Sequence, residues 1–138
     1  MVKKYKIVSL NKNHLFSKAY QKGATHANRF TAVYVMQNYK KMPDNMLFPT
    51  CMGITVNRKL GKAVKRNRVK RIIREAFRLI LPELKRGLIV VIAARSAAFN
   101  KEVKTKDIRF SLEKSFDAVG AFHGQALNHR GMSNTRKK

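Results

Sequence analysis

The chain has 138 residues, of which 44% are apolar, and this length and composition predict a single folded domain. Its 31 Lys and Arg residues outnumber seven acidic residues, so the formal net charge is +24. Such a charge destabilises a compact fold by self-repulsion unless a polyanion neutralises it. Nucleic acid is therefore the first candidate partner.

Membrane insertion, disulfides and metal sites find little support in the sequence. The longest apolar run, Leu88 to Ala94, is far shorter than the roughly 20 residues that span a bilayer. The N-terminus lacks a signal-peptide core, so we expect a cytoplasmic protein. Cys51 is the only cysteine and the four histidines lack ligand spacing, so we expect no disulfide and no metal site built by side chains.

The first predicted element is a short helix that follows the basic residues 1–9. Asn11 or Asn13 is a suitable N-cap, and Gly23 is a suitable residue to follow the last turn. The apolar face of this helix consists of Leu15, Phe16, Ala19 and Tyr20.

Two strands are predicted next. Residues 30–36, FTAVYVM, are β-branched and aromatic, which favours a strand. Residues 37–49 contain Asn, Lys, Pro and Asp and are typical of a hairpin loop. Residues 51–57 form a second strand, and we expect one face to pack on a core and the other to be wet. The apolar face is Met52, Ile54 and Val56, and the small or polar face is Cys51, Gly53, Thr55 and Asn57.

The stretch from Gly61 to Leu81 combines an apolar and a cationic stripe, each at helical spacing of about 100° per residue. This predicts a helix that packs on the core and presents a basic surface. The apolar stripe consists of Val69, Ile72, Ile73, Ala76, Phe77 and Ile80. The opposite stripe consists of Asn67, Arg71, Arg74 and Arg78.

Residues 58–78 hold ten cations and a single acid, Glu75. A face that only meets water would carry mixed signs, with acids placed to relieve like-charge neighbours. The sequence therefore favours a phosphate-binding surface, which suits arginine because its planar fork grips phosphate bidentately. No GxxxxGK[ST] pattern is present, so nucleotide hydrolysis has little support.

The remaining elements are a strand, a helix and a tail. LIVVIAA from Leu88 is apolar on both faces, so we expect it inside the sheet, joined to residues 51–57 by a parallel crossover. Residues 105–119 predict a last helix. We expect residues 1–120 to form one RNA-binding α/β domain and residues 121–138 to form a flexible basic tail.

Aromatic residues form a second candidate site. Phe16 and Tyr20 stand one turn apart, and Tyr34 lies on the first predicted strand. Aromatics at helical spacing are most often core residues. A neighbouring small, polar strand face favours a groove instead, in which single-stranded bases stack on the rings. The seven acids are dispersed, so we expect no catalytic side chains.

One stretch resembles a known family. The run RNRVKRIIREAFR, residues 66–78, with GKAVK and MGITVNRK before it, resembles the signature of the bacterial ribonuclease P protein subunit. LNKNHLFSKAYQKG from Leu10, ANRFTAVYV and LIVVIAARSAAF are similar to other segments of that family in kind and order. The resemblance covers roughly residues 5–118.

The resemblance implies a fold of the α/β class, an α+β sandwich of the ribosomal S5 domain 2-like type. Its four-stranded mixed sheet packs with three helices, and a left-handed βαβ crossover runs through the central helix. Chain physics alone would favour a right-handed crossover.

The resemblance also implies a function, that of an accessory subunit of a ribonucleoprotein endoribonuclease. The partners would be ribonuclease P RNA and precursor tRNA, whose 5′ leader is removed, with no membrane and no obligate protein partner. Hydrolysis and the Mg²⁺ ions would belong to the RNA, and the protein would hold no cofactor. A structural RNA-binding protein of ribosomal type and a protein-only nuclease are the alternatives.

Motif by motif, the resemblance assigns two sets of site residues. The wheel places Arg66 and Arg68 at the margins of the polar stripe, which leaves open a role in the fold for one of them. The residues implied to contact the catalytic RNA are Lys62, Arg66, Asn67, Arg68, Lys70, Arg71 and Arg74. Those implied to line or edge the leader cleft are Phe16, Tyr20, Tyr34, Thr55, Asn57, Arg58 and Lys59.

Overall fold

The computed structural model describes residues 7–9, 13–37, 50–85, 87–122, 124, 125 and 127. Its centre is a five-stranded sheet in the order β1-β4-β5-β3-β2. The strands are β1 (Ile7–Ser9), β2 (Ala24–Ala27), β3 (Thr31–Gln37), β4 (Thr50–Thr55) and β5 (Leu88–Ala94). The helices are α1 (Asn13–Lys22), α2 (Ala63–Ile80) and α3 (Thr105–Val119), and the short 3-10 helices are η1 (Arg58–Leu60), η2 (Leu81–Glu83) and η3 (Ser96–Phe99).

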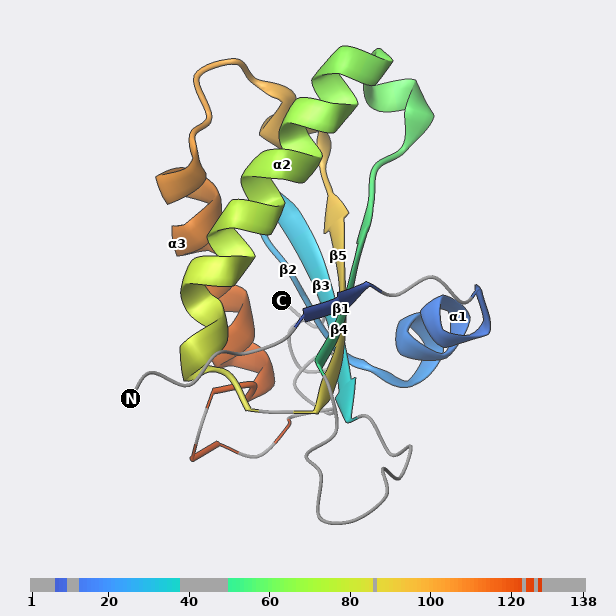
Figure 1. The fold of residues 1–138 in the computed structure, drawn as a ribbon, viewed down its shortest axis with the longest axis vertical. Helices are drawn as coiled ribbons and strands as arrows, with labels where there is room; N and C mark the ends of the chain where they lie inside the picture. The colour runs from blue at the N-terminus through green and yellow to red at the C-terminus, as the bar shows by residue number, and fades with distance from the viewer. Residues whose placement is uncertain are drawn as a thin grey trace.

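The sheet separates two layers of helices. In Figure 1, α2 and α3 lie on one face of the sheet and α1 lies on the other. Strand alternation divides β3 between them: Val33 and Val35 join the larger core under α2 and α3, whereas Met36 joins a smaller cluster with Ala19 of α1. β5 is buried on both faces, with β4 on one side and β3 on the other, as its apolar sequence predicted.

The central helix confirms the expected burial. All six residues of the predicted apolar stripe are the buried residues of α2. Arg71, Arg74 and Arg78 on the opposite side are exposed, so periodicity alone located both faces. The helix connects β4 to β5, which pair in parallel, and this confirms the crossover. Its left-handed sense stays a prediction.

The predicted hairpin between β3 and β4 is wrong. These strands do not pair with each other, because β5 lies between them, antiparallel to β3 and parallel to β4. Residues 38–49 lie outside the described part of the chain. The composition of residues 37–49 carried no information about which strand each neighbouring strand would join.

The mixed sheet with three helices is confirmed, and two of its strands escaped the residue-by-residue prediction. β2 pairs antiparallel with β3, and the three-residue β1 adds a fifth strand, parallel to β4, at one edge. Both are too short to show a periodic pattern. No helix in the described ranges is long and apolar enough to cross a membrane.

A buried polar network anchors α3 to the turn between β2 and β3. The amide nitrogen of Asn28 donates to the Ser111 carbonyl and to the Ser115 hydroxyl, both over 2.9 Å. The Ser111 hydroxyl donates to Oδ1 of Asn28 and is within 3.4 Å of the Thr31 hydroxyl. His26 adds a 3.0 Å bond between Nδ1 and the Ser115 hydroxyl, so the serines of α3 face the sheet edge without unpaired polar atoms.

The fold continues beyond Gly120, past the predicted start of the tail. Gly120 ends α3 in the left-handed conformation, with φ of 77°, as expected for a glycine after a helix. Ala121 is fully buried and Phe122 forms an antiparallel bridge with Leu84. Leu127 also packs against the core, whereas residues 128–138 lie outside the described part of the chain.

Candidate nucleic-acid interface

The outer side of α2 carries a set of exposed polar side chains that we call the basic face: Asn67, Arg71, Arg74 and Arg78. Within the described part of the chain, none of these four makes a hydrogen bond or an ion pair with another residue. The nearby acid, Glu75, instead accepts a 3.1 Å hydrogen bond from the Thr105 hydroxyl of α3. The positive charge of the basic face is therefore available to an external anion.

Two arginines of the same run are engaged inside the protein. The Arg68 guanidinium donates to the carbonyl oxygens of Val103 at 2.8 Å and Lys101 at 3.1 Å. Nε of Arg66 donates to the Gly61 carbonyl over 3.1 Å. Both side chains are half-buried, so the structure gives both of them, and not just one, a part in holding the fold.

The two lysines of the implied RNA-binding set differ in exposure. Lys62 is exposed at the N-cap of α2, where the first amides of a helix favour an anion. Lys70 is half-buried on the flank of the helix. Lys62 therefore adds an exposed cation at the start of α2.

Three residues of the implied leader cleft lie together on the side of the sheet that α1 covers. We call Tyr20, Tyr34 and Thr55 the aromatic surface. The tyrosine rings meet edge to face with their centroids 4.7 Å apart, and the Tyr20 hydroxyl lies 3.5 Å from the Thr55 hydroxyl. Tyr20 keeps 41% of its surface exposed, so it is not a sealed core residue.

The segment after β4 carries two further cations of the implied cleft. Asn57 caps η1, because its Oδ1 accepts a 2.8 Å hydrogen bond from the Lys59 amide. Arg58 and Lys59 are exposed directly after it. Phe16 lies on α1 one turn before Tyr20, and its side chain is outside the described part of the structure.

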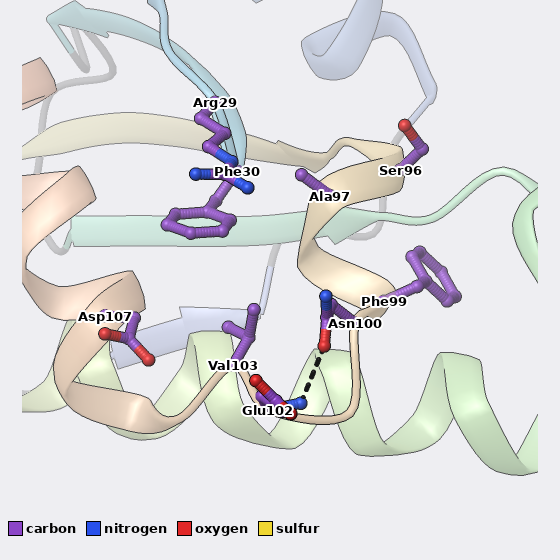
Figure 2. A pocket seen from close by; sticks show the side chains of 9 residues that line it. All are labelled: Arg29, Phe30, Ser96, Ala97, Phe99, Asn100, Glu102, Val103 and Asp107. Carbon is purple, nitrogen blue, oxygen red and sulfur yellow. Dashed lines mark hydrogen bonds between the residues drawn. The ribbon is translucent and has the colours of Figure 1, made fainter.

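A pocket of about 560 Å³ lies elsewhere, between the β2–β3 turn, η3 and the start of α3 (Figure 2). The Arg29 guanidinium lies 5.5 Å from the centre of the Phe30 ring at its rim. Asp107 accepts from the Lys104 amide at 2.8 Å, and Asn100 accepts from the Glu102 amide at 2.9 Å. These polar groups serve the local backbone, so we do not include the pocket in the nucleic-acid interface.

Comparison with known proteins identifies the family. A family model described as Ribonuclease P matches residues 5–120. The chain is 39% identical over 111 residues to the ribonuclease P protein component of Clostridium acetobutylicum, covering 80% of this chain and 87% of the relative. The chain belongs to the ribonuclease P protein family. It is thus a protein subunit of a tRNA-processing ribonucleoprotein, and the ribosomal-type alternative finds no support in these relatives.

Solved structures of this family share the fold. The Staphylococcus aureus RNase P protein is 32% identical, with a TM-score of 0.69 over 86% of this chain and 100% of that chain. The RNase P protein from Thermotoga maritima is 28% identical, with a TM-score of 0.60 over 72% of this chain and 86% of that chain. The family resemblance inferred from the arginine-rich run is confirmed.

Val64 is an exposed residue beside the basic face that the sequence did not single out. It lies on the outer side of α2 with 80% of its surface exposed, next to Asn67 and Arg71. Its place on the polar side of the helical wheel was the available signal.

Proposed function

We propose that the protein holds ribonuclease P RNA on the basic face of α2 and the 5′ leader of precursor tRNA on the aromatic surface. The RNA performs the hydrolysis and binds the Mg²⁺ ions that assist it, and the protein stabilises the complex of enzyme and substrate. The protein binds both RNAs in the cytoplasm.

The observation that carries the RNA-binding proposal is a difference among the arginines of α2: some bond to the protein and others do not. Arg66 and Arg68 donate to backbone carbonyls, whereas Arg71, Arg74 and Arg78 have no partner among the described residues. Three unpaired guanidinium groups on one helix face repel each other in the free protein. A phosphate backbone removes this repulsion and accepts the bidentate hydrogen bonds that arginine offers.

The leader proposal depends on the exposure and chemistry of the aromatic surface. Single-stranded RNA is commonly bound by rings on which unstacked bases lie, beside cations that meet the phosphates. Tyr20 offers a partly exposed ring that Tyr34 supports from its edge. Thr55 offers a hydroxyl to a ribose or base, and Arg58 and Lys59 are exposed three and four residues after it.

Several acidic residues make contacts within the protein. Metal-assisted phosphodiester hydrolysis by a protein needs carboxylates gathered at one site. In the described ranges, no three His, Cys, Asp or Glu residues gather closely enough to hold a metal ion. Glu113 pairs with Arg109 at 3.1 Å, and Asp117 accepts from the Gln125 amide at 2.9 Å, so these acids serve the fold.

The experiment is a cleavage assay on precursor tRNA with three samples: protein treated to remove bound RNA, ribonuclease P RNA alone, and the reconstituted complex. We expect no cleavage by the protein, slow cleavage by the RNA at high Mg²⁺, and efficient cleavage by the complex at lower Mg²⁺. Metal-dependent cleavage by the RNA-free protein would contradict the proposal and favour a protein nuclease.

A further inference from the structure

A hollow of about 500 Å³ lies on the outer side of the first turns of α2. Its lining residues all belong to this one helix, so it is an open hollow of the surface and not an enclosed ligand pocket. The residues that line it, spaced by three, four and seven positions, form one stripe of the helix. They are Val64, Asn67, Arg68 and Arg71.

The apolar member of this stripe is Val64, which is 80% exposed. A single exposed apolar residue is ordinary on a protein surface. Val64 differs because it lines a hollow whose other side chains carry an amide and two guanidinium groups. A β-branched residue is also a poor choice for an exposed helical position that needs only solubility. Its position therefore favours contact with an apolar part of the bound RNA.

Arg68 gives the hollow a fixed wall. Its guanidinium is held by the carbonyls of Val103 and Lys101, at 2.8 and 3.1 Å, so the head group points away toward the segment before α3. The aliphatic stem is then left to line the hollow beside Val64. Arg71, which makes no such bond among the described residues, keeps its charge available at the other end.

Asn67 supplies a group that can read a base. Its amide has both a donor and an acceptor, and neither is used by the described residues. Such an amide can pair with two atoms on one edge of a base, as asparagine does with adenine. Phosphate oxygens, by contrast, accept only and would leave the amide oxygen unpaired.

We propose that this hollow holds an unpaired base of the ribonuclease P RNA, seated on Val64 and the Arg68 stem, with Asn67 bonded to its edge. The inference rests on the proposed binding of the RNA to α2 and adds a base contact to it. The base must be unpaired, because side chains cannot reach the base edges in the deep major groove of an RNA duplex. An adenine fits the donor and acceptor of Asn67 best.

The test compares the affinity of full-length variants for ribonuclease P RNA over a range of salt concentrations. Val64→Ser and Asn67→Ala are each expected to weaken binding about tenfold without changing the salt dependence. Arg71→Ala should weaken binding and also lower the slope of log K against log salt by about one phosphate. Leu79→Ser, on the same helix at 52% exposure and outside the hollow, is the matched control and should bind as the parent does.

Chemical footprinting of the RNA with diethyl pyrocarbonate, which modifies adenine at N7, locates the base. We expect one unpaired adenine to be protected by the parent protein and modified again with Asn67→Ala. Unchanged affinity of both hollow variants beside a loss with Arg71→Ala would overturn the base contact and leave RNA binding by α2 intact. A reduced salt slope for Asn67→Ala would show that Asn67 contacts a phosphate and not a base. This result would also overturn the proposal. Loss of self-association in Val64→Ser, with RNA affinity intact, would assign the hollow to a second copy instead.

Discussion

The Arg68 guanidinium on α2 donates a 2.8 Å hydrogen bond to the carbonyl oxygen of Val103, just before α3 begins. A second bond from the same nitrogen reaches the Lys101 carbonyl at 3.1 Å. An arginine of the arginine-rich run therefore links α2 to the segment that leads into α3. The proposed RNA binding on α2 and the stability of the helical layer thus depend on the same run of residues.

This role predicts that Arg68→Ala lowers the free energy of unfolding by about 1–2 kcal/mol, because two carbonyl groups lose a charged donor. Urea denaturation followed by circular dichroism measures the effect. Arg71→Ala is the matched control and should unfold at the parent concentration of urea, since Arg71 makes no bond among the described residues. Equal stability of the two variants would show that the Arg68 bonds contribute nothing.

The aromatic surface predicts a selective loss of leader binding. Tyr20→Ala should weaken the affinity of the reconstituted complex for precursor tRNA by about 1–3 kcal/mol, the usual contribution of one stacked base. Affinity for mature tRNA should not change, because it has no leader. Phe16→Ala should behave in the same way.

Tyr20→Phe is the control for the ring of Tyr20. It keeps the edge-to-face contact with Tyr34 and removes only the 3.5 Å contact with Thr55, so most of the affinity should remain. Equal losses for precursor and mature tRNA in Tyr20→Ala would remove the leader assignment from this surface.

Gly23 predicts a stability effect at the end of α1. A Cβ atom at this position would lie 2.6 Å from the Ala19 carbonyl oxygen and 3.1 Å from the Val35 carbonyl oxygen, and both are backbone atoms. Gly23→Ala must therefore shift α1 relative to β3 and should cost about 1–3 kcal/mol in thermal or urea unfolding. Gly61→Ala, whose Cβ meets the Phe99 ring at 3.0 Å, should cost less because a side chain can move. The reverse order would contradict this explanation.

The polar network under α3 predicts a loss of stability when Asn28 is replaced. Asn28→Ala removes two 2.9 Å bonds to Ser111 and Ser115 and leaves buried polar atoms unpaired. The expected loss is about 2–3 kcal/mol of unfolding free energy. Asn100→Ala, at an exposed position with one bond to the Glu102 amide, should lose under about 1 kcal/mol. Similar losses for both would mean that the network is weak.

Local periodicity explains what the sequence predicted well. The buried side of α2 and the bounds of α3 follow from apolar spacing within one helix, and the structure confirms both. Strand pairing is different because it joins residues distant in the chain. Nothing in residues 30–57 indicates that β5, which begins at Leu88, inserts between β3 and β4.

The candidate site shows the same limit. The wheel identified which residues of α2 face outward but could not show where each head group ends. Arg66 donates to the Gly61 carbonyl, and Arg68 donates to the carbonyls of Lys101 and Val103. The acceptors of Arg68 come from the segment after β5, which is distant in the sequence, so the wheel could not indicate them. The contact between the Tyr20 and Thr55 hydroxyls likewise depends on the fold, which brings α1 and β4 together.

The central claim is that the basic face of α2 holds ribonuclease P RNA, and the salt dependence of RNA affinity tests it most directly. For the double variant Arg71→Ala and Arg74→Ala, we expect parent stability, weaker binding, and a slope of log K against log salt reduced by about two phosphates. Unchanged affinity and unchanged slope in a folded double variant would contradict the account.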